Sequence, residues 1–276
     1  MSLFPYLWAA FGLVIGSFLN VCIYRLPRHK SIVFPGSHCP QCGKPVKPYD
    51  NIPVISYLWL RGKCRFCRKP ISLQYPVVEL LSGLAFYACA AEWGFTPPAF
   101  VNSLFLAVII ILIFTDYHHQ ILPNVLTLPG VVAGILLSPF QTPAFFRETF
   151  SLLLASFVSP AHTEAALPWV GSLLGALIGG GILYLVGAAY QALRKRQGLG
   201  MGDIKMMAMV GAFTGWRLAL LTIFVGSFLG SIVGILLVLF GGRTLQHKLA
   251  FGTFLGAATA IALFYGATLL QWYLPV

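Results

Sequence analysis

The sequence predicts an all-α polytopic membrane protein with about eight transmembrane helices and a cytosolic, zinc-ribbon-like loop between helices 1 and 2. Of its 276 residues, 58% are hydrophobic and 9% are charged, whereas soluble chains carry roughly 25% charged residues. Several continuous apolar runs also reach the length of about 20 residues that a membrane-crossing helix needs. Because these runs do not alternate with polar residues, they exclude a transmembrane β-barrel.

The first predicted span covers residues 3–24. No lysine or arginine precedes it, whereas Arg25 and Arg28 follow directly. A cleavable signal peptide has the reverse order, with a basic start and a cleavage site after the apolar run. We therefore expect a retained helix whose N-terminus lies outside the cell. Its small and polar residues from Gly16 to Asn20 favour contact with another helix.

Most of the positive charge is concentrated in one segment. The formal net charge is +11, and ten of the 18 lysines and arginines lie between Arg25 and Lys69. In a chain with many spans this clustering indicates a cytosolic loop, because basic loops remain inside the cell. We therefore expect no nucleic acid as a partner. The expected surroundings are a lipid bilayer, whose acidic headgroups can meet the basic loop.

This polar loop, residues 25–74, contains two CxxC pairs, Cys39 with Cys42 and Cys64 with Cys67. Its seven prolines argue against long helices. Two CxxC pairs separated by 21 residues can supply the four thiolates of a tetrahedral zinc site, and a structural metal would explain how so proline-rich a segment folds. Disulfides, a redox role and metal-free thiols are the alternatives, and a reducing cytosol disfavours the disulfides.

The other apolar runs predict seven further spans, at residues 76–93, 98–117, 121–140, 168–190, 204–215, 218–240 and 249–272. The segment 204–215 is short and covers only roughly 18 Å at 1.5 Å per residue. Residues 141–167 are mixed in character, and 145–158 are compatible with a helix at the outer surface or a partial re-entrant segment. We divide the chain into helix 1 (1–24), the tetracysteine loop (25–74) and a core of about seven helices (75–276).

Threading eight spans from an outside N-terminus provides a check on the topology. All basic residues except Arg147 and Arg217 then face the cytosol, which is 16 of the 18. The same threading brings both Asp116 and Asp203 to the cytosolic face, although neither residue was used to set it.

Three of the seven acidic residues lie near the cytosolic ends of predicted spans: Glu79, Asp116 and Asp203. Asp203 follows a glycine-rich stretch in which Gly200 and Gly202 permit a sharp bend and a close approach of other segments. Two aspartates held within about 3 Å cannot both ionise. The charged one can then take a proton from water while the neutral one polarises a scissile carbonyl group. The alternative is that each aspartate caps a helix end in contact with water.

Other chemistries have less support in the sequence. It contains no GxSxG motif and no P-loop. His118 and His119 are adjacent on a predicted turn and project differently, which disfavours a shared metal ion, and we expect His119 to be a polar neighbour of Asp116. A proton-coupled transporter is the strongest rival, because paired intramembrane carboxylates also relay protons. It predicts inverted repeats of broken helices, which we do not find. A non-catalytic scaffold with a zinc loop is a further alternative.

Several motifs occur together, namely GSFLNVCIYRLP from Gly16, the two CxxC pairs, YPVVEL from Tyr75, the segment from Asp116 through His119 to Asn124, and GMGDIK from Gly200. In this order they resemble the prepilin peptidases, or type IV leader peptidases, within the GxGD membrane aspartyl proteases. Two departures stand out. Asn124 occupies a position where the family often has a second Asp, and Leu249-Ala250 replace the usual Ile-Pro before Phe251-Gly252.

The resemblance implies that Asp116 and Asp203 are catalytic and that Gly200, Gly202 and His119 support them. It implies cleavage of a short basic leader from type IV prepilins or pseudopilins at the cytosolic face of the bacterial inner membrane. Members with the cysteine loop commonly also N-methylate the new N-terminal residue with S-adenosylmethionine, and Glu79 is a candidate contributor to that reaction. The residues alone reveal no methyl-donor site.

Overall fold

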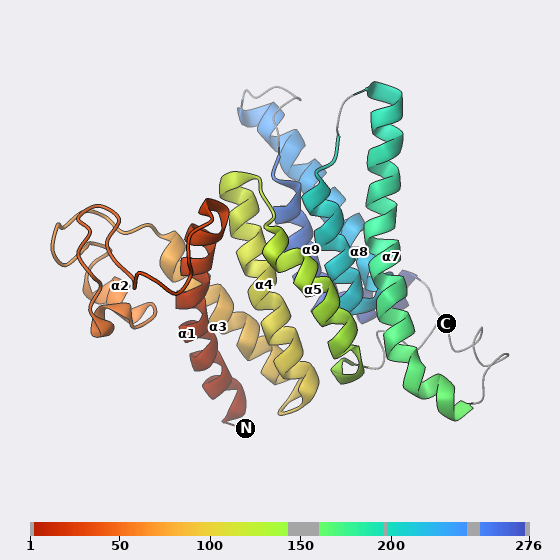
Figure 1. Ribbon diagram of the computed structural model, residues 1–276, viewed down its shortest axis with the longest axis horizontal. Coiled ribbons are helices and arrows are strands. Elements are labelled where there is room, and N and C mark those ends of the chain that lie inside the picture. Colours follow the sequence, from red (N-terminus) through yellow and green to blue (C-terminus); the bar gives the residue numbers. More distant parts are fainter. Residues whose placement is uncertain (1–2, 143–159, 196–197, 242–248, 274–276) are drawn as a thin grey trace. The chain divides into compact units, whose positions relative to one another are not determined.

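The computed structural model describes residues 3–142, 160–195, 198–241 and 249–273, and the regular structure of these residues is helical (Figure 1). Within these ranges there is no β-sheet, and the extended pairings are two isolated bridges, His38 with Pro45 and Lys63 with Pro70. The chain divides into two compact units, Met1–Thr115 and Asp116–Val276. The predicted all-α class is confirmed.

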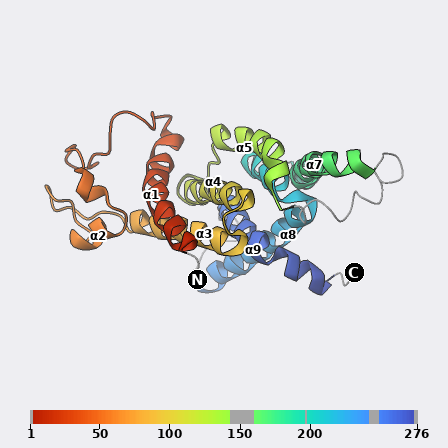
Figure 2. The same cartoon turned by 90° about the horizontal axis from the view of Figure 1, so that it is seen from below.

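The first unit is built on α1 (Phe4–Arg25) and α3 (Gln74–Trp93), which lie side by side (Figures 1 and 2). Small residues allow the two helices to approach closely. A Cβ atom at Gly12 would lie 2.7 Å from the Cβ of Phe86, and one at Gly16 would lie 2.6 Å from the Cα of Glu79. The predicted helix-contact role of the segment from Gly16 is therefore confirmed.

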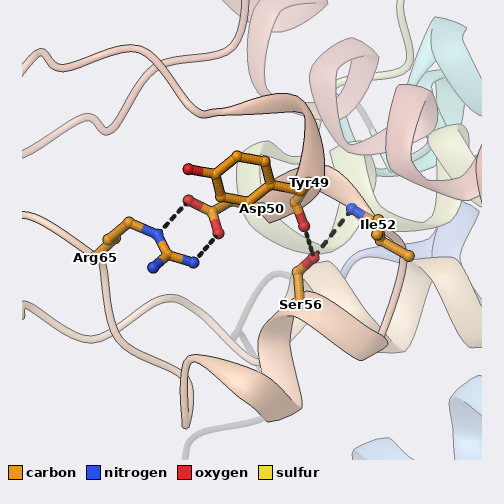
Figure 3. Close-up of polar contacts among 5 residues, drawn as sticks. All are labelled: Tyr49, Asp50, Ile52, Ser56 and Arg65. Carbon is orange, nitrogen blue, oxygen red and sulfur yellow. Dashed lines mark hydrogen bonds and ion pairs between the residues drawn. The ribbon is translucent and has the colours of Figure 1, made fainter.

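The loop between α1 and α3 contains only short helical pieces, η1 (Leu26–Arg28), η2 (Pro48–Asn51) and α2 (Ile55–Trp59). Side chains connect η2, α2 and Arg65 (Figure 3). The Ser56 hydroxyl donates to the Tyr49 carbonyl at 2.9 Å and accepts the Ile52 N–H at 3.0 Å. Arg65 donates two hydrogen bonds to Asp50, at 2.7 and 2.5 Å. These bonds hold the pKa of the Asp50 carboxyl below its usual range.

The helix α4 (Pro97–His119) crosses the boundary between the two units, and its last turn from Asp116 belongs to the second unit. Residues 116–119, which were expected in a polar turn, are helical, and the chain turns at Gln120, whose φ is 52°. The next helix, α5 (Asn124–Leu137), starts after Pro123 rather than at residue 121 and is followed by η3 (Ser138–Phe140).

The second unit contains three long helices, α7 (Pro160–Arg194), α8 (Met201–Gly241) and α9 (Phe251–Tyr273). The helix α8 packs against α5, α7 and α9. Glycines bring α7 and α8 into backbone contact: Gly175 meets Gly211, and a Cβ atom at Gly179 would lie 2.6 Å from the carbonyl oxygen of Met207. The close packing expected from the glycine-rich fifth span is confirmed.

Five helices in the described residues are long and apolar enough, by length and composition, to cross a membrane: Phe4–Arg28, Pro97–His119, Leu167–Arg194, Met201–Phe240 and Phe251–Gln271. A shorter apolar helical segment covers Asn124–Phe140. The chain is therefore a multi-pass membrane protein.

The predicted sixth and seventh spans occur as two helical segments within α8. They are separated by Gly215, whose φ of 78° and ψ of 172° are not helical. Only glycine adopts such a conformation without strain. The sixth segment begins at Met201, inside the glycine stretch, so it is longer than the predicted 204–215. The predicted surface or re-entrant helix at 145–158 lies outside the described residues.

Candidate active site and metal centre

Asp116 lies near the end of α4 and is only 5% exposed. Its Oδ2 accepts two hydrogen bonds from one residue, the Thr253 backbone N–H at 2.7 Å and the Thr253 hydroxyl at 3.2 Å. Thr253 is the third residue of α9, and the first N–H groups of a helix have no acceptors inside that helix. Asp116 therefore caps α9 at the end where the helix dipole favours a negative charge.

Asp203 lies in the first turn of α8 and is half-buried. Its backbone N–H donates to the Gly200 carbonyl at 3.2 Å, and the Gly200 backbone lies beside its carboxyl group. The Asp203 carboxyl is close enough to Asp116 for the two charges to interact. The fold thus brings together the two aspartates that the sequence singled out, and both belong to the second unit.

Leu122 fills the space beside these carboxyl groups, and this leaves no room for a side chain at the nearby glycines. A Cβ atom at Gly202 would lie 3.0 Å from the Leu122 Cβ, and one at Gly252 would lie 3.0 Å from both the Leu122 Cδ1 and the Asp116 Oδ2. A Cβ atom at Gly200 would lie 3.2 Å from the Asp203 Oδ2. None of these glycines has a positive φ. The expected close approach is confirmed, and the chain bends at Leu199 without a left-handed residue among these glycines.

Other polar residues surround the pair. His119 is half-buried and follows Asp116 by three residues on α4, a spacing that places side chains on the same helix face. The Lys205 ammonium group donates to the Asn124 Oδ1 at 3.0 Å. Asn124, which departs from the family pattern, therefore still provides an acceptor for the lysine that follows the GxGD segment.

Sequence reasoning missed Gly252 and Thr253. The sequence signal was the Phe-Gly-Thr at the start of the last apolar run, where a glycine permits close approach and a helix N-terminus needs an acceptor. Threonine is common in membrane helices, so only the fold identifies this one as the partner of Asp116.

The four loop cysteines form one cluster. The potential ligand atoms of Cys39, Cys42, Cys64 and Cys67 all lie within 4.8 Å of one another, and the Cys39 and Cys67 sulfurs are 3.9 Å apart. A tetrahedron with Zn–S bonds of about 2.3 Å places its sulfurs about 3.8 Å apart. This donor set therefore fits a zinc ion, and disulfide bonds are absent because all six cysteines are free.

Both CxxC pairs have the same backbone geometry. In one, the Cys39 N–H bonds to the Lys44 carbonyl, and in the other the Cys64 N–H bonds to the Lys69 carbonyl, each at 2.9 Å. Backbone N–H groups of Cys67 and Phe66 lower the pKa of the Cys64 thiol to about 6. Such donors favour the thiolate, which is the form that binds metal.

Glu79 belongs to the first unit and lies on α3, where it is 7% exposed. Its Oε2 accepts the Val54 N–H at 2.7 Å, and the Ser17 hydroxyl is within hydrogen-bonding reach of the same carboxyl group. Among the described residues, the two buried acidic sites therefore lie in separate units. The aspartate pair can carry out acid–base chemistry, and Glu79 offers a single enclosed carboxylate.

Two family models match the chain. The model described as "Bacterial Peptidase A24 N-terminal domain" matches residues 10–93, and the one described as "Type IV leader peptidase family" matches residues 103–235. The first range contains the tetracysteine loop and Glu79, and the second contains both aspartates. No solved structure matches the chain.

Curated relatives carry the name "Prepilin leader peptidase/N-methyltransferase". The chain is 40% identical to the one from Myxococcus xanthus over 233 residues, which is 84% of this chain and 62% of that protein. It is 33% identical to the Aeromonas hydrophila protein over 292 residues, or 96% of this chain and 91% of that one. For the Pseudomonas aeruginosa protein the identity is 32% over 286 residues, with 95% and 91% coverage. Nothing in these comparisons supports a transporter.

Proposed function

Because this chain belongs to the type IV leader peptidase family, we propose that it is a membrane aspartyl endopeptidase that removes the leader of type IV prepilins or pseudopilins and then N-methylates the new N-terminal residue. The printed names of its relatives combine these two activities. The proposed location is the bacterial inner membrane, with the N-terminus outside and the aspartates at the cytosolic face. The clustering of basic residues in the first loop supports this orientation.

The observation that carries the peptidase activity is the proximity of Asp116 and Asp203 within one unit. We assign the ionised role to Asp116, because two donors of Thr253 bind one of its oxygens, and hydrogen bonds to a carboxylate favour its charged form. Asp116 then takes a proton from water, and the water oxygen attacks the scissile carbonyl carbon. Asp203, in its protonated form, donates to the carbonyl oxygen. Collapse of the tetrahedral species breaks the C–N bond, and a proton passes to the leaving amine.

Around this pair the neighbouring residues have positioning roles in our proposal. Gly200, Gly202 and Gly252 leave room for the two carboxyl groups and Leu122. His119 supplies a polar group one turn from Asp116. A prepilin with a basic leader would bring its cleavage site to these carboxyl groups from the membrane surface.

In the loop, the cofactor we propose is a structural zinc ion held by Cys39, Cys42, Cys64 and Cys67, which the sulfur geometry supports. A bound ion would connect the two CxxC pairs and fix the intervening segment, which includes η2 and α2. For the methyl transfer, S-adenosylmethionine supplies an activated methyl group whose transfer forms one C–N bond, breaks one C–S bond and releases one proton. We assign Glu79 a contribution to this second activity.

Separate Asp116→Asn and Asp203→Asn variants test the peptidase assignment. Each amide is nearly the size of the carboxyl group but cannot exchange the proton, so cleavage of a prepilin peptide should fall by roughly 100- to 10,000-fold. Glu92→Gln is the matched control, because Glu92 is an exposed acid on α3. Normal cleavage by either aspartate variant would exclude the pair as the catalytic centre.

A further inference from the structure

Glu79 is a buried carboxylate without a cationic partner in the part of the chain that the structure describes. Its neighbours are the Val54 N–H, at 2.7 Å, and the Ser17 hydroxyl. Among the described residues, no lysine, arginine or histidine pairs with it, and the ion pair of this unit is Arg65 with Asp50. Burying a charge without an opposite charge is costly. Glu79 is therefore suited to a positive charge that comes from outside the chain.

Two further buried polar atoms next to Glu79 have no hydrogen-bond partner. The Asn20 amide group donates to the carbonyls of Gly16 and Tyr75 at 3.3 and 3.1 Å, which leaves its Oδ1 without a partner. The Ser82 hydroxyl is also without a partner, and it is completely buried. Gly16 packs directly on both Glu79 and Ser82. Native structures rarely leave buried polar atoms unsatisfied unless a water molecule, an ion or a ligand completes them.

The loop residue that contacts Glu79 has a strained backbone. Val54 has a φ of 61° and a ψ of −49°, and the Ile55 N–H bonds to the Pro53 carbonyl at 2.6 Å, which makes a three-residue γ-turn. A β-branched residue with a positive φ is a genuine outlier. Such strain collects where a site needs a defined geometry, and here the turn directs the Val54 N–H to the Glu79 carboxylate.

A partly open cavity of about 510 Å³ adjoins this cluster through Ser17. Its walls include Val14, Ser17 and Phe18 from α1 and the segment from Asn51 to Pro53, directly before the γ-turn. Ser17 links the cavity to the buried charge, because its hydroxyl reaches Glu79 and lies 3.5 Å from the Asn51 Oδ1. The volume falls within the range of about 300–1,000 Å³ of small-molecule sites, which are mostly apolar with a few placed polar groups.

We propose that this cavity and the adjoining Glu79, Ser17 and Asn20 form the binding site for S-adenosylmethionine, with the Glu79 carboxylate as the counter-charge of its sulfonium group. The apolar wall takes the uncharged part of the ligand. The proposal rests on the N-methyltransferase activity proposed above and gives it a location within the first unit. It also gives the site a means of product release, because the charge of the sulfonium is lost when the methyl group leaves, and the product S-adenosylhomocysteine is a neutral thioether.

The test is a binding titration of the full-length protein in lipid nanodiscs with S-adenosylmethionine and, separately, with S-adenosylhomocysteine. The wild type should bind the sulfonium compound more tightly. Glu79→Gln should weaken binding of S-adenosylmethionine by about 10- to 100-fold, as expected for the loss of a buried charged contact. It should change binding of the neutral thioether by less than about threefold. Glu92→Gln is the matched acidic control and should change neither affinity.

Two further measurements distinguish a failure of the proposed binding site from a failure of the proposed N-methyltransferase activity. Cleavage of a prepilin peptide by Glu79→Gln should remain at the wild-type level, because the aspartate pair lies in the other unit. Retained binding of S-adenosylhomocysteine shows that the first unit of the variant is folded. Equal binding of S-adenosylmethionine by wild type and Glu79→Gln would overturn the proposed site. If the wild type neither binds S-adenosylmethionine nor methylates a pre-cleaved peptide, the proposed N-methyltransferase activity itself fails, and the site fails with it.

Discussion

Asp116 and Glu79 are anchored in nearly the same way, yet their surroundings differ. They are 5% and 7% exposed, respectively. Each carboxyl group accepts a backbone N–H at 2.7 Å. Each also lies within reach of a hydroxyl group, which belongs to Thr253 for Asp116 and to Ser17 for Glu79. Asp116 has a second carboxyl group, Asp203, close enough to interact with its charge, whereas no other described carboxyl group interacts with Glu79. The pair can share a proton, while the single carboxylate can balance a cation.

The origin of the backbone donor also differs. For Asp116 it is the regular first turn of α9, so the anchor follows from the packing of helices. For Glu79 it is the strained Val54 turn, which belongs to the tetracysteine loop. The second anchor therefore depends on how well the loop is folded, and the first does not.

The largest expected effect is the loss of the metal in Cys64→Ser. Removing one of four thiolates opens the tetrahedral set and frees the loop. Zinc content should fall to a small fraction of the wild-type value, and amide hydrogen exchange should increase throughout the loop that carries Val54. Cys22→Ala is the control, because Cys22 is buried in α1 and outside the cluster. Full zinc retention in Cys64→Ser would contradict the proposed metal centre.

The next effect concerns space beside Asp116. In Gly252→Ala the new Cβ would lie 3.0 Å from the Asp116 Oδ2 and 3.1 Å from its Cγ, so the carboxyl group must shift. A displacement of about 1 Å in a catalytic group can reduce the rate about 100-fold, and cleavage assays on a prepilin peptide should detect this. Gly181→Ala is the matched control, since nothing lies within 4 Å of a Cβ atom there. Equal activity of the two variants would argue against a role for Asp116.

A smaller effect is expected from the hydroxyl group that holds Asp116. Thr253→Val keeps the side-chain shape and the backbone N–H but removes the 3.2 Å hydroxyl donor. The kcat for cleavage should fall about 10-fold, as for loss of a hydrogen bond to a charged group, with little change in KM. Thr253→Ser restores the donor and should restore kcat. A serine variant as slow as the valine variant would mean that shape, and not the hydrogen bond, is what matters.

The smallest effect is expected within the loop, at the Asp50–Arg65 pair. Arg65 lowers the pKa of Asp50 in the folded protein, so this contact stabilises the loop at pH values above the unfolded pKa of about 3.9 and is lost as the pH falls through the lower, folded value. The unfolding midpoint of Asp50→Asn should thus be slightly lower than that of wild type at pH 7, and the difference should narrow below about pH 4. Protonation of the cysteine ligands in acid affects Asp50→Asn and the wild type alike, so it does not change the difference between their unfolding midpoints. A difference in unfolding midpoint that widens below about pH 4 would contradict the lowered pKa of Asp50 in the folded protein.

Much of the architecture could be predicted because long apolar runs favour helices. Helices occur at all eight expected segments, and five helices of the described residues are long and apolar enough to cross a membrane. The two aspartates could be found because only seven acids are present and three of them, including Glu79, lie near the ends of predicted spans. The partners of these acids could not be found this way. Thr253 and Val54 are ordinary residue types whose roles come from a helix end and a turn brought close by the fold. The break at Gly215 falls between the predicted spans 204–215 and 218–240, but its backbone conformation could not be foreseen, because glycine recurs throughout these helices and only one glycine adopts a non-helical φ inside α8.

The most direct test of the account measures both activities in two variants side by side. Asp116→Asn and Glu79→Gln are each assayed for cleavage of a prepilin peptide and for methyl transfer to a pre-cleaved peptide, which removes the need for prior cleavage. We expect opposite losses: Asp116→Asn methylates but does not cleave, and Glu79→Gln cleaves but methylates poorly. Loss of both activities in both variants, or wild-type levels of the assigned activity in either, would contradict the assignment of one reaction to each carboxylate site.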